Sequence, residues 1–203
     1  MTPNVEFLFD FGSPNAYLAH KVIPEIEKRT GAKFEYVPVL LGGLFKLTGN
    51  QAPMVAFGNI KNKMPYEMLE TQRFIKKHNI AAYKFNPNFP VNTLALMRMA
   101  VAAKAMGILP RYAEAVFHFM WEDPRKMDDA AVIRAALIEA GLDADALNAA
   151  AQTPEVKQGL MANTERAVAR GAFGSPTFFV GNEIYFGKNT LPEVEDEILR
   201  VKA

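Results

Sequence analysis

The start of the chain carries an apolar run, residues 5–11, that stops at Gly12 and is followed at once by Ser13-Pro14. The run is rich in aromatic side chains, which predicts a buried strand. Serine is a favoured helix N-cap, and proline is favoured at the first helical position. We therefore expect the chain to pass directly from a strand into a helix, with Ser13 at the junction.

The next residues complete a strand–helix–strand unit. Residues 14–29 predict a helix, because apolar side chains recur at every fourth position on one face. Gly31 suits the end of that helix, and residues 33–37 alternate like a second strand. Two parallel strands joined in this way are connected by a right-handed crossover in nearly all proteins.

The middle of the chain, residues 43–170, is rich in Ala, Met and Leu and in signals that start and stop helices. We predict Asn92, Asp128 and Thr153 as helix caps. The predicted helices cover residues 62–78, 93–106, 111–121, 129–140 and 154–170. This pattern indicates an all-helical block.

The last part of the chain returns to strands. Residues 177–180 and 183–186 flank Gly181-Asn182, which predicts a tight β-hairpin, and residues 191–201 predict a closing helix. The order is then strand–helix–strand, a helical block, and strand–strand–helix.

This order indicates the α/β class and a thioredoxin-like fold with a large all-helical insertion. We assign residues 1–42 and 171–203 to a discontinuous thioredoxin-like domain and residues 43–170 to the inserted helical domain. No position marks a flexible linker, so we expect the insertion to pack on the rest of the fold.

Composition excludes several classes of protein. The 203 residues contain no cysteine, so disulfides, thiolate metal sites and redox chemistry of the protein's own thiols are excluded. The net charge is +1 with no basic cluster, which argues against a nucleic-acid partner. The histidines lack metal-ligand spacing, and we expect no metal. With no leader pattern and no long apolar stretch, we expect a cytoplasmic protein without a membrane partner.

Aromatic and sulfur-containing side chains crowd one predicted helix, at Phe117, Phe119, Met120 and Trp121. These are too many for one face of a helix that is buried on one side only. We interpret the excess as a pocket wall or a dimer surface.

A second signal lies far downstream, where Gly174-Ser175-Pro176 precedes the hairpin. A helix start points free N–H groups and a partial positive charge at whatever lies beyond it. A serine at a helix start that faces a proline loop is suited to holding another molecule's thiolate. The alternatives are that Ser13 is only a helix cap and that Pro176 is an ordinary trans turn proline.

Three stretches, residues 9–18, 86–93 and 173–179, resemble the 2-hydroxychromene-2-carboxylate isomerase and kappa-class glutathione transferase family. That family is a branch of the DsbA-like thioredoxin superfamily. The resemblance implies that glutathione is the cofactor and that the Ser13 hydroxyl is catalytic, hydrogen-bonding the glutathione sulfur. It also implies that Pro176 is cis and that the Ser175 backbone pairs with the cysteinyl group of the tripeptide.

The resemblance implies further contacts around this centre. The loop Phe186, Gly187, Lys188 and Asn189 would bind the γ-glutamyl end of glutathione, although many members have Asp-Arg where this chain has Asn189-Thr190. Asn50 and Lys63 fall near positions that the family uses around glutathione, and Lys63 is alternatively a solvated helix charge. For the aromatic substrate, the nearest candidates are Lys46 and Phe89.

The function implied is a glutathione-dependent isomerase of 2-hydroxychromene-2-carboxylate, an intermediate of aromatic degradation. The thiolate would add reversibly, allow rotation between cis and trans forms, and leave again. One alternative is a kappa-like glutathione transferase or peroxidase that consumes glutathione. The other is a non-catalytic thioredoxin-fold binding module that lacks redox cysteines. Relatives of this kind imply a homodimer with a small aromatic molecule as substrate.

Overall fold

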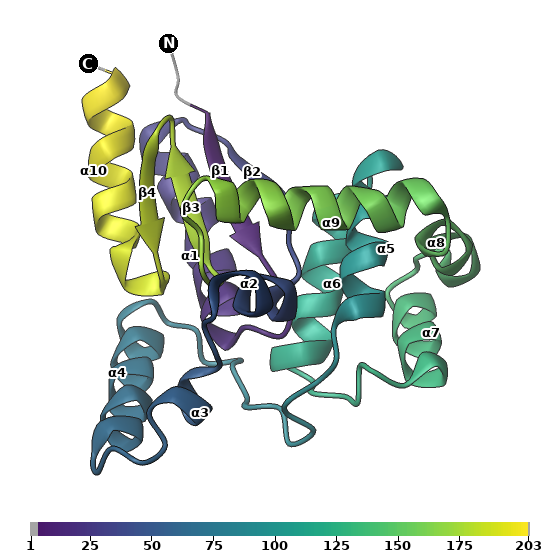
Figure 1. Ribbon diagram of the computed structural model, residues 1–203, viewed down its shortest axis with the longest axis horizontal. Helices are drawn as coiled ribbons and strands as arrows, with labels where there is room; N and C mark the ends of the chain where they lie inside the picture. Colours follow the sequence, from purple (N-terminus) through teal and green to yellow (C-terminus); the bar gives the residue numbers. More distant parts are fainter. Residues whose placement is uncertain (1–3, 203) are drawn as a thin grey trace.

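A four-stranded mixed sheet organises the protein, as the computed structural model of residues 4–202 shows (Figure 1). The strand order is β2-β1-β3-β4. Strand β1 runs parallel to β2 and antiparallel to β3, and β3 pairs antiparallel with β4. The strands are β1 (Val5–Phe9), β2 (Phe34–Pro38), β3 (Thr177–Val180) and β4 (Glu183–Phe186). The predicted thioredoxin-like fold is confirmed.

Alternation along the central strand explains how helices cover both faces of the sheet. Phe7 belongs to the larger apolar cluster, which includes α1 (Pro14–Thr30) and α10 (Leu191–Lys202). Leu8 points to the other face, where it packs with residues of α2 (Leu41–Thr48) and α9 (Pro154–Ala169). The inner strands β1 and β3 are therefore buried on both sides, whereas most of the edge strand β4 is exposed (Figure 1).

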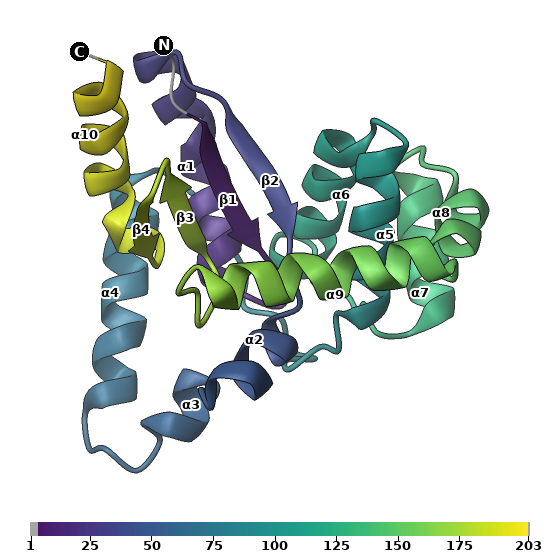
Figure 2. The same ribbon diagram turned by 45° about the horizontal axis from the view of Figure 1, so that its top comes forward.

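The remaining helices lie on two sides of the sheet. A helical lobe contains α5 (Leu94–Ala105), α6 (Leu109–Trp121), α7 (Ala130–Glu139) and α8 (Ala144–Ala151). On the other side, α3 (Pro53–Ala56) and α4 (Lys63–Lys77) form an arm that extends away from the sheet (Figure 2). The short helix η1 (Lys188–Thr190) precedes α10. One apolar cluster includes residues of the sheet and of the lobe. The division at residues 42 and 170 stays a prediction.

Two predicted caps are displaced by one residue. Helix α7 starts after Asp129, whose carboxylate accepts from Ala131 N at 2.9 Å, so Asp128 is not the cap. The cap residue of α5 is Thr93, although the Asn92 side chain still accepts from Leu94 N at 3.1 Å. The predicted caps of the two long helices α1 and α9 are confirmed. Helices α2 and α3 were not predicted.

The interpretation of the aromatic cluster in α6 as a pocket wall or dimer surface is wrong. Phe117, Phe119, Met120 and Trp121 are each at most 3% exposed. Helix α6 packs against α1, α5 and α7, so it is covered on more than one side. The polar residues Arg111, Glu114 and His118 occupy its outer side, and the aromatic side chains belong to the core.

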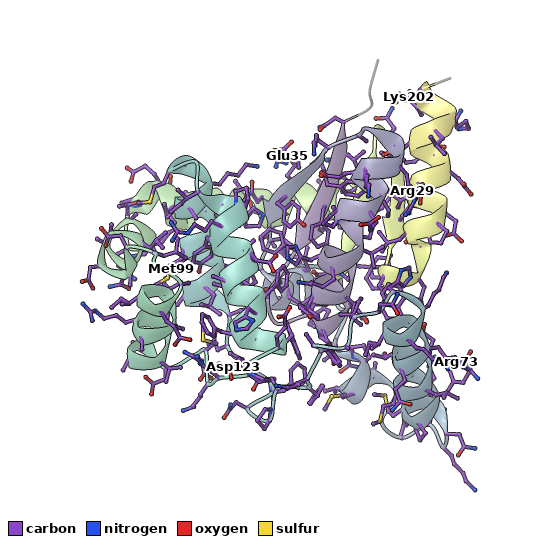
Figure 3. All side chains as sticks on the ribbon, turned by 180° about the vertical axis from the view of Figure 1, so that it is seen from behind. Arg29, Glu35, Arg73, Met99, Asp123 and Lys202 are labelled. Atoms are coloured by element: carbon purple, nitrogen blue, oxygen red, sulfur yellow. The ribbon has the colours of Figure 1, made fainter. Side chains whose placement is uncertain are left out.

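The end of α1 is joined to α10 at the edge of the molecule. Arg29 of α1 forms an ion pair with Glu195 of α10, and Lys202 donates to the Thr30 carbonyl at 2.8 Å. Figure 3 shows Arg29 and Lys202 close together, whereas Met99 lies in the helical lobe. No helix in the described part of the chain is long and apolar enough to cross a bilayer.

Trp121→Phe tests how the lobe is joined to the end of β1. The Trp121 indole donates to the Phe11 carbonyl at 2.9 Å, and both groups are buried. The variant keeps a ring in the core but leaves that carbonyl without its donor, so the free energy of unfolding should fall by about 1–3 kcal/mol. Urea denaturation followed by far-ultraviolet circular dichroism measures this, because the variant lacks the chain's single tryptophan. An unchanged midpoint would contradict the assignment.

Candidate functional site

The chain contains two serines, and they meet in space. The Ser13 hydroxyl donates to the Ser175 carbonyl at 2.8 Å, across 162 positions of sequence. The pairing of β1 with β3 makes this contact possible, because Ser13 follows the end of β1 and Ser175 precedes the start of β3. The helix start and the proline loop that the sequence singled out therefore form one site.

The first turn of α1 presents open donors at this site. The Ser13 hydroxyl accepts from Ala16 N at 3.2 Å, as expected of a helix cap. Pro14 has no N–H, and within residues 4–202 the N–H groups of Asn15 and Ser175 have no hydrogen-bond partner. The partial positive charge of the helix start adds to these donors. The arrangement is suited to a ligand that is anionic or rich in acceptors.

The Ser175–Pro176 bond is cis, as the resemblance implied. The Pro176 carbonyl accepts from Gly187 N at 2.9 Å, which ties the loop to the segment before α10. The loop approaches the Phe186 ring closely at Gly174, where a Cβ would lie 2.7 Å from that ring and the exposed Phe186 side chain would have to move. A second cis bond, Phe89–Pro90, was not predicted from the sequence.

A buried carboxylate that the sequence analysis missed lies directly behind the site. Asp10 follows β1 and is fully buried. It accepts from Gly12 N at 2.8 Å, from Leu41 N at 2.7 Å and from the Thr93 hydroxyl at 2.7 Å. Burial raises the pKa of this carboxyl, and the hydrogen bonds from Leu41, Gly12 and Thr93 oppose that rise. The signal in the sequence was an acid inside an otherwise apolar run.

A hollow of about 340 Å³ opens beside Asp10 and Gly12. Its other walls come from α2, from the α2–α3 connection and from the segment before α5. Most of the side chains involved are apolar, among them Leu41, Phe45, Phe89, Val91 and Leu94. Phe89, predicted to contact the substrate, therefore lies in this wall. Lys46 is exposed on α2 next to Phe45 but does not line the hollow.

The Ser13 hydroxyl itself lies behind the hollow and not in its wall. Ser13 is 4% exposed, and neither Ser13 nor Ser175 lines the hollow. Its neighbours Gly12, Pro14 and Asn15 are half-buried, so the first turn of α1 reaches the surface around it.

Of the two polar residues predicted from the middle of the chain, one joins the site directly. The Asn50 amide donates to the Phe173 carbonyl at 2.9 Å, which brings it to the proline loop. Lys63 forms an ion pair with Glu67 and lies 5.5 Å from the Phe57 ring, within the arm. No contact of the described residues joins Lys63 to either serine.

The loop before α10 is partly occupied by an internal ion pair. Lys188 is 3% exposed and donates to Glu70 of α4 and, at 3.0 Å, to the Asn189 side chain. Its ammonium also lies 4.9 Å from the Phe74 ring. Lys188 thus fixes the arm to the segment before α10, while the Phe186 ring is exposed and its centroid lies 4.4 Å from that of the Phe173 ring. Figure 3 shows Arg73, by contrast, on the outer side of α4.

A larger hollow of about 560 Å³ lies in the helical lobe, at the starts of α5 and α7. Arg98, Lys126, Asp128 and Gln152 contribute to its walls. None of the residues predicted for glutathione or for the substrate lines it. Within residues 4–202, no group of three His, Asp or Glu side chains is placed to hold a metal ion.

Comparisons with known proteins show which family the chain matches. Residues 4–199 match the family described as DSBA-like thioredoxin domain. A 2-hydroxychromene-2-carboxylate isomerase of Sphingobium xenophagum is 28% identical over 202 residues, which cover 98% of this chain and all of the relative. Glutathione S-transferase kappa 1 of Homo sapiens is 25% identical over 182 residues, covering 85% of this chain and 78% of the relative.

Among solved structures, that of a 2-hydroxychromene-2-carboxylate isomerase superposes with a TM-score of 0.82. It is 24% identical in sequence, and the match covers 97% of this chain and 95% of that chain. At this identity the likeness shows the fold.

Ser175→Ala tests the packing of the proline loop against β1. The Ser175 hydroxyl accepts from Asp10 N at 3.1 Å, and both atoms are buried. Removing the oxygen leaves a buried N–H without a partner, so the free energy of unfolding should fall by about 1–3 kcal/mol. Thermal and urea unfolding measure the change. A variant as stable as the wild type would show that this hydrogen bond is not needed to hold the loop.

Proposed function

The chain belongs to the DSBA-like thioredoxin family, and on that premise we propose that it is a glutathione-dependent isomerase of 2-hydroxychromene-2-carboxylate or a closely related aromatic-degradation intermediate. One observation carries the proposal. A serine hydroxyl at the start of α1 is bonded to the cis-proline loop, in a chain that has no cysteine of its own. A thiol at this place must therefore come from a bound molecule.

The groups at the site fit glutathione. The open N–H groups of Asn15 and Ser175 match an anionic sulfur and the acceptors of a peptide. A thiol pKa of about 8.5 falls at a helix N-terminus, where the partial positive charge favours the thiolate. Because Ser13 is 4% exposed, we propose that the sulfur approaches through the half-buried positions Gly12 and Asn15.

A change of hydrogen-bond partner would prepare the site. The Ser13 hydroxyl donates to the Ser175 carbonyl in the free protein. Rotation about the Cβ–Oγ bond moves only the hydrogen, so the hydroxyl can instead donate to a sulfur anion, and such a bond is stronger than the neutral one it replaces. The freed Ser175 carbonyl can then accept an N–H of the tripeptide, as when a peptide adds a strand to a sheet edge.

Other residues would complete the glutathione site. Asn50 is bonded to the proline loop and is placed to contact the peptide. We assign the γ-glutamyl end to the segment from Phe186 to Asn189. Within it, Lys188 is already paired with Glu70 and the Gly187 N–H is bonded to the Pro176 carbonyl, so exposed Asn189 is the available group.

The hollow beside Gly12 is suited to the substrate. When bound, glutathione supplies a thiolate that adds reversibly to a conjugated double bond and so permits cis/trans rotation. The apolar walls at Leu41, Phe45 and Phe89 would hold the ring system and exclude water. We propose exposed Lys46 as the cation that meets the substrate carboxylate from the rim.

We also propose that the protein is cytoplasmic and forms a homodimer. Large apolar side chains are exposed in α2, α3, α4 and their connections, and a second copy of the chain could cover them. They include Leu47, Met54, Val55, Ile60, Tyr66 and Met68.

The runner-up function is a kappa-like glutathione transferase or peroxidase that uses the same site. The similarity to human glutathione S-transferase kappa 1 favours it as the second candidate. An isomerase leaves the glutathione concentration unchanged over many turnovers, and a transferase depletes it in step with product. Thiol quantification during turnover separates the two.

Ser13→Ala tests the assigned role of the hydroxyl. The loss of one donor to a reacting anion should lower kcat by about 100-fold. The affinity for glutathione should change by less than about fivefold, because the peptide contacts remain. Isomerisation followed by substrate absorbance and glutathione binding followed by calorimetry give the two numbers.

Thr153→Ala is the matched control. Thr153 caps α9 and precedes Pro154, just as Ser13 caps α1 and precedes Pro14, but it lies away from the site. It should lose stability from its missing cap while keeping turnover. Equal turnover in Ser13→Ala and the wild type would refute the role of Ser13.

A further inference from the structure

Asp10 is a buried acidic residue with an unusually large number of hydrogen bonds. It is fully buried, and within residues 4–202 no lysine, arginine or histidine pairs with it. Burying a carboxylate without a cation is costly unless hydrogen bonds compensate for the lost water. Five bonds converge on this residue, two to its main chain and three to its side chain.

The main chain of Asp10 joins the two serines of the site. Its carbonyl accepts from Ser13 N at 3.0 Å, and its N–H donates to the Ser175 hydroxyl at 3.1 Å. Both candidate ligand-binding segments are thus fixed to the same residue at the end of β1.

The side chain of Asp10 joins three segments that wall the hollow. One oxygen accepts from Gly12 N and from the Thr93 hydroxyl, and the other accepts from Leu41 N. Helix α2 has no side-chain cap from its own cap residue, Leu40, so Asp10 supplies that cap from 31 positions away. Thr93 likewise makes no cap bond to α5, because its hydroxyl goes to Asp10.

The contacts around Gly12 show how closely these segments approach one another. A Cβ added to Gly12 would lie 3.3 Å from the Asp10 carboxylate and 3.3 Å from the Thr93 methyl group. The turn into α1, the start of α2 and the segment before α5 are therefore held at their meeting point by one carboxylate.

We propose that Asp10 is a positioning residue of the active site, which sets the walls of the substrate hollow against the Ser13 turn. This inference rests on the proposed function for its catalytic consequence. The Asp10 joint, meaning the hydrogen bonds that the Asp10 carboxylate accepts from Gly12, Leu41 and Thr93, is a property of the free protein. A carboxylate is needed because all three side-chain partners can donate to it. Asparagine would turn an NH₂ group toward at least one of these donors and leave a buried N–H or O–H unpaired.

Asp10→Asn tests the proposal, first by hydrogen exchange of the free protein. We expect the amides of residues 10–13, 40–44 and 89–94 to exchange about tenfold faster, as for the loss of one buried hydrogen-bond partner. The amides of α8, far from the joint, should be unchanged. Uniform acceleration over the whole chain, or none, would overturn the proposal, since Asp10 would then be a general stabiliser or dispensable.

The second measurement separates positioning from stability. In Asp10→Asn, kcat should fall at least about tenfold, while the glutathione affinity measured by calorimetry should change by less than about threefold. Unchanged kcat would overturn the proposal. Asp143→Asn is the matched control, because Asp143 caps α8 by accepting from Ala146 N at 2.9 Å in an exposed position. It should leave both values unchanged.

Thr93→Val provides a milder variant if Asp10→Asn does not fold. It removes one donor from the joint and keeps the side-chain shape, so faster exchange confined to residues 89–94 and the Gly12 turn supports the proposal. Exchange identical to the wild type would overturn it. Failure of the wild type to bind glutathione would defeat the proposed function alone, and the exchange pattern would still decide whether Asp10 is the joint.

Discussion

The hydrogen bond from the Ser13 hydroxyl to the Ser175 carbonyl is the contact on which the account of this protein depends. It brings the positive end of α1 against a loop whose backbone N–H is open, and both groups lie at the end of the central strand β1. The pairing of β1 with β3 brings these segments together. The fold therefore produces the site as a direct result of its strand order.

The surroundings of that contact are fixed from two directions. On one side, Trp121 of the helical lobe donates to the Phe11 carbonyl, and Asn86 donates to the Met120 carbonyl at 3.1 Å. On the other, Asp10 holds the first residue of α2. The turn from β1 into α1 is thus enclosed by groups distant in sequence. Because the turn is held in place, the donors at the start of α1 need little reorganisation when an anion binds or a charge develops.

Local sequence patterns predicted those elements whose conformation depends mainly on neighbouring residues in the chain. The apolar run before Gly12, the left-handed Gly31 after α1 and the Gly181-Asn182 hairpin each carry their own signal, and all three elements are present. The start of α7 was misplaced because two adjacent aspartates can each cap a helix, and the backbone direction chooses Asp129. Helix α2 was missed since its cap comes from Asp10.

The candidate site was predictable in its centre but not at its edges. Ser13 and the Pro176 loop carry specific motifs, and the structure brings them together. The burial of Lys188 depends on Glu70, which lies 118 positions away and has no sequence signal that points to it. The excess of aromatic residues in α6 was interpreted as surface because only the tertiary packing covers that helix on several sides.

The most direct measurement of the central claim is the ionisation of the glutathione sulfur on the protein. Difference ultraviolet absorbance of the thiolate, recorded while glutathione is bound and the pH is varied, gives its midpoint. We expect a midpoint at least about one unit below the free-thiol value of about 8.5, because the start of α1 and the Ser13 hydroxyl favour the anion. A midpoint equal to that of free glutathione, or no binding at all, would contradict it.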